Sequence, residues 1–106
     1  MKAKLYTQSY RLDTSNKDPI FHWIPEELGY CERDYEFDED RTCHENAERL
    51  SDMLKGGLMN QYTAMGVDPH PVAALICAES SWFGVEIFYQ NQDCTMKLSG
   101  RVFLHR

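Results

Sequence analysis

The stretch "TCHENAERLSDMLKGGLMNQYTAMG", residues 42–66, carries the clearest secondary-structure pattern in the chain. Thr42 and Glu45 have the spacing of a capping box, in which each side chain bonds the backbone N–H of the other residue. Apolar residues then recur at steps of three and four, which is typical of an amphipathic helix. They are Ala47, Leu50, Leu54, Leu58, Tyr62 and Met65. Gly66 is a natural C-terminal stop, so we predict one helix over this stretch.

Two glycines, Gly56 and Gly57, fall inside the predicted helix. Together they cost about 2 kcal/mol relative to alanine at the same positions. Two adjacent glycines are compatible with a kink or a break, and the sequence leaves open whether the helix is interrupted at this point.

The residues after this helix predict a second helix and a hairpin. Asp68 before Pro69 resembles an N-cap followed by a first-turn proline, so we expect a helix from about Pro69 to Trp82. A buried strand over residues 72–78 is the alternative, because periodicity cannot separate the two over so short a run. Residues 85–90 and 95–105 alternate as the two strands of a β-hairpin. Gly100 lies on the apolar face of the second strand and indicates a bulge or the close approach of a helix.

The residues before the helix predict one strand and irregular structure. Residues 2–12 favour a strand, and Pro25 to Gly29 favour a single helical turn. A chain of 106 residues suits one domain, 1–106. The expected fold class is α+β: a small antiparallel sheet of about three strands, packed on one face by two helices, with a long acidic loop.

Charge is distributed unevenly along the chain, whose formal net charge is −6. The segment from Glu26 to Lys55 holds eleven acidic and four basic residues, a net charge of −7. Direct binding of nucleic acid depends on Lys and Arg contacts to phosphates, so this acidity argues against it. It favours a basic protein or a nucleoprotein complex as the partner.

The densest acidic stretch is "ERDYEFDED", residues 32–40. If it is extended, alternation places Tyr35 and Phe37 on one side and four carboxylates on the other. These carboxylates belong to Glu32, Asp34, Glu36 and Asp38. They would lie about 6.5–7 Å apart, which is similar to the spacing of phosphates along one DNA strand. A flexible, solvated acidic loop is the alternative interpretation.

Aromatic residues flank this stretch, and aromatic side chains beside charges are typical of interface hot spots, although they also serve as core. We therefore predict a small, non-enzymatic, acidic binding protein that acts as a nucleic-acid mimic. It would block a basic, nucleic-acid-handling partner stoichiometrically, as phage anti-defence proteins and toxin immunity proteins do. The expected partner-binding residues are Glu32, Asp34, Glu36, Asp38, Glu39, Asp40, Trp23, Phe21 and Tyr30. No cofactor is expected.

A metal site is part of an alternative, catalytic interpretation. Cys31, Cys43, His44 and His22 supply sulfur and imidazole ligands of the kind that zinc prefers. Structural zinc sites usually bring such ligands in close pairs such as CxxC, and this chain has none. The default interpretation is therefore free thiols and surface histidines.

The stretch "ALICAESSW", residues 74–82, resembles the sequence around the catalytic glutamate of lytic transglycosylases. The resemblance implies that Glu79 would be a general acid, and a position on the apolar side of a helix would raise its pKa as that role requires. "GLMN" at residues 57–60 is similar to another motif of that family, but here it precedes the glutamate. A glutamate-based or metal-dependent catalytic module is thus the alternative function.

The N-terminal residues become polar within a few positions and form no apolar signal-peptide core. The longest apolar run, residues 72–78, is far shorter than the roughly 18 residues that span a bilayer. We expect a cytoplasmic protein without membrane contact. A structural subunit that associates with itself is a third possibility, and the sequence leaves the oligomeric state open.

Overall fold

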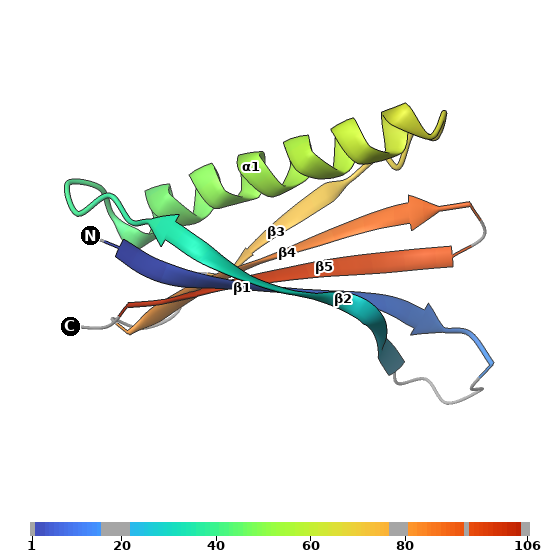
Figure 1. The fold of residues 1–106 in the computed structure, drawn as a ribbon, viewed down its shortest axis with the longest axis horizontal. Coiled ribbons are helices and arrows are strands. Elements are labelled where there is room, and N and C mark those ends of the chain that lie inside the picture. Colours follow the sequence, from blue (N-terminus) through green and yellow to red (C-terminus); the bar gives the residue numbers. More distant parts are fainter. Residues whose placement is uncertain (1, 16–21, 77–80, 93, 105–106) are drawn as a thin grey trace.

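The computed structural model describes residues 2–15, 22–76, 81–92 and 94–104. The elements in chain order are β1 (Lys2–Asp13), β2 (His22–Glu36), α1 (Cys43–Ala64), β3 (Val72–Ile76), β4 (Trp82–Asn91) and β5 (Cys94–Phe103). The strands form one antiparallel sheet in the order β2-β1-β5-β4-β3 (Figure 1). The first and last strands of the chain therefore lie side by side in the middle of the sheet.

The predicted fold class is wrong, because the described residues form a five-stranded antiparallel sheet with a single helix. We expected about three strands and two helices. The helical turn expected at Pro25 to Gly29 lies within β2, and so does most of the predicted acidic loop. The helix expected from about Pro69 to Trp82 is wrong, because residues 72–76 form β3 and Trp82 begins β4. The alternative of a strand is confirmed for residues 72–76, but its predicted burial is wrong, since Val72, Leu75 and Ile76 are exposed.

A turn explains why no helix starts at Asp68. Its carboxylate accepts a hydrogen bond from the backbone N–H of His70 at 3.2 Å, as an N-cap would. His70, however, has a φ of 46°, in the left-handed region that no helix start uses. The chain therefore turns back, and residues 72–76 pair with β4.

The helix α1 confirms the capping prediction. The Thr42 hydroxyl accepts a hydrogen bond from the N–H of Glu45 at 3.1 Å, and the Glu45 carboxylate accepts one from the N–H of Thr42 at 3.4 Å. Gly66 has a φ of 76° just beyond the helix, as expected of a C-terminal glycine. The helix runs through Gly56 and Gly57 without a break, which answers the question that the sequence left open. Packing of the apolar stripe on the sheet outweighs the glycine penalty.

The core lies between α1 and one face of the sheet. Its fully buried side chains include Leu5 of β1, Phe83 of β4 and Leu50 of α1. A Cβ added to Gly100 of β5 would lie 2.8 Å from Cδ1 of Leu54. The predicted close approach of a helix at Gly100 is therefore confirmed.

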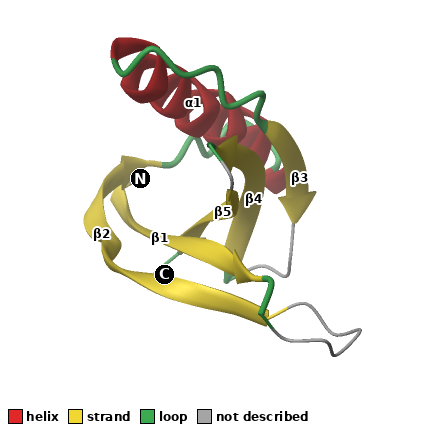
Figure 2. Ribbon diagram, turned by 90° about the vertical axis from the view of Figure 1, so that its right-hand side faces the viewer, coloured by secondary structure: helices red, strands yellow, loops and turns green. Residues whose placement is uncertain are grey.

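The helix covers only that one face, as the view in Figure 2 shows. It packs mainly on β3 and β4, while β1 and β2 curve away from it. No other described element packs on the opposite face, which we call the open face, although at one end of it the ring of Trp23 on β2 lies 5.8 Å from that of Phe88 on β4. Its side chains include Lys2, Lys4, Tyr6, Gln8, Tyr10 and Leu12 of β1, Trp23, Tyr30, Glu32, Asp34 and Glu36 of β2, Val72, Ala74 and Ile76 of β3, Trp82, Glu86 and Phe88 of β4, and Lys97, Ser99, Arg101 and Phe103 of β5.

Candidate interaction surface

A strip of aromatic rings crosses the open face from β2 to β4. The ring of Tyr6 lies 6.5 Å from that of Tyr30 and 5.6 Å from that of Phe103, measured between centroids. Phe103 in turn lies 6.4 Å from Trp82. Tyr30 is 57% exposed and Phe103 is 38% exposed, so this strip offers apolar area to a partner.

Cations lie on further aromatic rings of the same face. Lys97 Nζ is 4.7 Å from the centroid of Tyr10 and 4.9 Å from that of Trp23. The guanidinium of Arg101 lies 5.2 Å from the ring of Trp82. These cation–π contacts fix the rings in place before any partner arrives, which lowers the entropy lost on binding.

The acidic residues of β2 alternate as the sequence predicted. Tyr35 and Phe37 face the helix side, where their rings lie 6.1 and 6.0 Å from the ring of Phe83. Glu32, Asp34 and Glu36 project from the open face and are exposed; we call these three residues the acidic row. The row belongs to a strand at the edge of the sheet and is anchored from the opposite side by the partly buried Tyr35 and by the buried Phe37 just beyond the strand.

Cations on β1 compensate part of this row. Asp34 stands opposite Lys4 in the strand register, and Lys4 Nζ donates to Asp34 Oδ1 at 2.9 Å. This hydrogen bond, together with the lysine charge, lowers the pKa of the Asp34 carboxyl, and it raises the pKa of Lys4. Glu32 stands opposite Tyr6 instead of a cation. Glu36 stands opposite Lys2, so Glu32, beside the aromatic strip, is the residue of the row whose register neighbour on β1 is not a cation.

Asp38 does not continue the row, because β2 ends at Glu36 and the chain turns toward α1. One carboxylate oxygen of Asp38 accepts hydrogen bonds from Arg41 Nε at 3.1 Å and Arg49 Nη1 at 3.3 Å. The other oxygen accepts the N–H of Asp40 at 3.0 Å. Asp38 thus holds the turn together and lies outside the acidic row.

The remaining predicted residues are divided between three places. Tyr30 and Trp23 lie on the open face with the acidic row. Glu39 and Asp40 are exposed in the turn before α1, and Phe21 lies outside the described residues.

The sequence prediction missed Tyr6, Trp82 and Phe103 as parts of one surface. These residues lie on three different strands, β1, β4 and β5. Apolar and polar residues alternate within each strand, but the register between the strands, which brings the three rings together, cannot be read from the sequence of any single strand.

The features of the alternative function do not form a site among the described residues. No group of three His, Cys, Asp or Glu side chains there is arranged to hold a metal ion. His44 pairs with Glu48 at 3.0 Å, one turn along the helix, while Cys31 and Cys43 are free thiols. Glu79 lies outside the described residues.

A comparison with known protein families, curated proteins and solved structures finds no match for this chain. Within the described part of the chain, no helix has the length and apolarity needed to cross a bilayer.

Proposed function

We propose that this protein is a non-catalytic binding protein that docks its open face on a basic protein, or on the protein part of a nucleoprotein complex, and blocks it stoichiometrically. The observation that carries the proposal is the combination of an exposed aromatic strip with the acidic row on one uncovered sheet face. Aromatic side chains supply the contact area, and the row selects a partner of opposite charge.

The strand β2 joins the two parts of this surface. Tyr30 lies two residues before Glu32 on the same strand and face, so a partner that covers the ring also meets the carboxylate. Among the described residues, the register neighbour of Glu32 on β1 is Tyr6 and not a cation, so an Arg or Lys of the partner can pair with Glu32 there. At Asp34 a partner must compete with Lys4, which favours a partner that presents several cations.

A single-stranded nucleic acid is a second candidate ligand for the same face. Lys97 and Arg101 lie beside aromatic rings there, and such a combination is typical of surfaces on which bases stack. The acidic row opposes this candidate, because it repels phosphates.

Charge reversal on β2 distinguishes the two candidates. Replacing Glu32 and Asp34 together with lysine is expected to lower the retention of a basic partner from host lysate by at least about tenfold at low salt. Wild-type retention itself should fall as salt rises, because exposed charges are screened. The measurement is an affinity pull-down over a salt series, with mass spectrometry and with nuclease-treated lysate as a parallel sample.

The matched control replaces Glu48 and Asp52 with lysine, which gives the same change in net charge on the exposed side of α1. This control should retain the partner like the wild type. Equal loss in both double variants would mean that net charge alone drives binding. Retention of nuclease-sensitive material by the wild type would replace the basic partner with a nucleic acid.

A further inference from the structure

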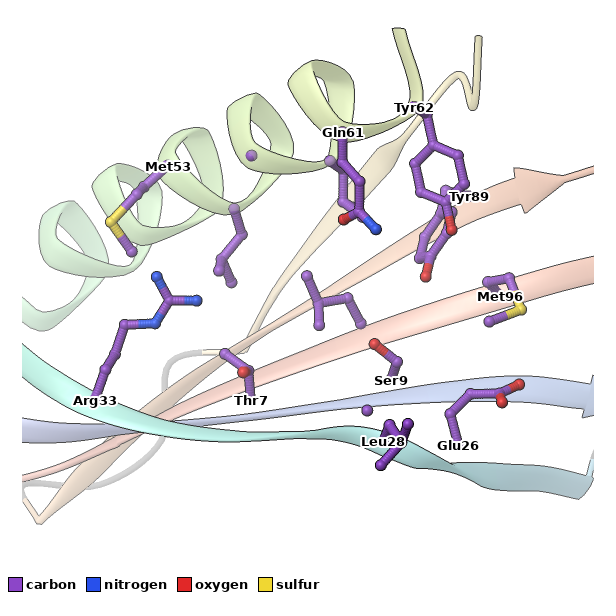
Figure 3. A pocket seen from close by; sticks show the side chains of 15 residues that line it. Thr7, Ser9, Glu26, Leu28, Arg33, Met53, Gln61, Tyr62, Tyr89 and Met96 are labelled. Atoms are coloured by element: carbon purple, nitrogen blue, oxygen red, sulfur yellow. The ribbon is translucent and has the colours of Figure 1, made fainter. Parts of the chain in front are cut away.

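A groove of about 500 Å³ lies on the other side of the sheet, between α1 and the paired strands β1 and β2 (Figure 3). It exists because α1 packs on β3 and β4, so that β1 and β2 diverge from the helix. The volume falls within the range of small-molecule sites, roughly 300–1,000 Å³. Its lining includes Ser9, Glu26, Arg33, Gly57, Leu58 and Leu98.

The apolar walls of the groove come from α1 and β5. Leu54 and Leu58 line it from the helix, and Met96 and Leu98 line it from the sheet. Gly57 lies between the two leucines on the same side of the helix, and a Cβ added there would meet no atom within 4 Å. The missing side chain therefore leaves room for the apolar body of a ligand.

A bulge in β2 forms one rim of the groove. Residues 26–29 stand opposite the single residue Ser9, and Gln8 Nε2 donates to the backbone oxygens of Ser9 at 2.9 Å and Glu26 at 3.1 Å. A Cβ on Gly29 would lie 2.9 Å from Cβ of Glu26, so glycine is required for this shape. Leu28, at the tip of the bulge, is 100% exposed and extends the apolar rim.

The charge of the groove is set by Arg33. Its side chain projects from β2 into the space between sheet and helix, on the side of Met53, and it makes no ion pair with another described residue (Figure 3). Glu26, in contrast, pairs with Arg11 at 3.8 Å. Burial, and then the hydrogen bond with Tyr62, raise the pKa of Tyr89, so this hydroxyl brings no negative charge to the groove. The uncompensated charge among the lining side chains is therefore positive.

We infer that the groove binds a small amphiphile, with an apolar chain or ring between α1 and β5 and one carboxylate at Arg33. A guanidinium holds a carboxylate through two parallel N–H···O bonds, and the walls remove apolar surface from water. This site lies on the opposite side of the sheet from the open face and is independent of the proposed docking.

Three ligands with the same ten-carbon chain and different head groups test this inference: decanoate, decanol and decyltrimethylammonium. Titration followed by amide NMR should shift signals of Gly29, Gly57 and Leu98. Decanoate is expected to bind at least about fivefold more tightly than decanol, because its carboxylate gains a charge-assisted hydrogen bond with Arg33. Decyltrimethylammonium should bind most weakly, because Arg33 repels its charge. A different order of head groups, or decanoate shifts outside the groove, would overturn the inference.

Two variants and a control separate the head group from the apolar walls. Arg33→Gln should remove the advantage of decanoate over decanol and leave decanol binding unchanged. Gly57→Leu should weaken all three ligands, while Gly56→Leu, on the neighbouring helix position outside the lining, should not. Arg33 is exposed, so its variant remains informative even if Gly57→Leu perturbs the helix. Groove shifts that grow with protein concentration alone would assign the groove to a second copy and contradict the inference.

Discussion

Replacement of Asn46 by leucine is expected to lower the free energy of unfolding by about 3 kcal/mol, because it leaves several buried polar groups without partners. Asn46 is fully buried at the start of α1. Its side-chain oxygen accepts the N–H of Asp38 at 3.1 Å, and its amide group donates to the carbonyls of Asp38 at 3.0 Å and Thr42 at 2.9 Å. Urea denaturation followed by circular dichroism measures the loss.

Asn60→Leu is the matched control, because Asn60 is exposed on the same helix. It should change stability by less than about 0.5 kcal/mol. Asn46→Asp keeps the shape but loses the two donors, so it should destabilise the protein as well. A stable Asn46→Leu variant would mean that the turn between β2 and α1 does not depend on this side chain.

Replacement of Phe83 by alanine is expected to cost about 4 kcal/mol, the value typical of a fully buried phenylalanine. Phe83 is 0% exposed and is the side chain against which Tyr35 and Phe37 pack. Its removal should therefore also loosen the end of β2 that carries the acidic row. Thermal and urea unfolding measure the first effect, and hydrogen exchange of residues 32–36 measures the second.

Phe103→Ala is the comparison on the open face. Phe103 is partly exposed on β5, in contact with Tyr6 and Trp82, so its removal should cost only about 1 kcal/mol. Equal costs at Phe83 and Phe103 would contradict the claim that the helix side is the core and the open face is uncovered.

Local patterns in the sequence predicted α1, its capping box and the hairpin of β4 and β5, because each depends on residues close together in the chain. The edges of the sheet were not predicted, because their pairing depends on residues that are far apart in the chain or on signals that also suit other structures. β3 is only five residues long, and an Asp-Pro pair precedes it that also suits a helix start. Pro25 and Gly29 belong to a bulged strand, whose irregular pairing with β1 hides the alternation.

The acidic row was predictable because alternation within one extended segment fixes its two sides. The lysine opposite Asp34 and the aromatic strip were not, because both depend on which strands are neighbours. The role of Asp38 was missed for a related reason: the end of β2 and the two arginines near it are set by the turn and the helix.

Hydroxyl-radical footprinting of the protein with and without its captured basic partner tests the central claim most directly. Tyr30 and Phe103 report on the open face, and Met53 and Met65 are exposed reporters on and beside α1. Docking through the open face predicts that oxidation of Tyr30 and Phe103 falls in the complex, while oxidation of the two methionines is unchanged. Protection of Met53 and Met65 with unchanged oxidation of Tyr30 and Phe103 would contradict it and would place the partner on the helix.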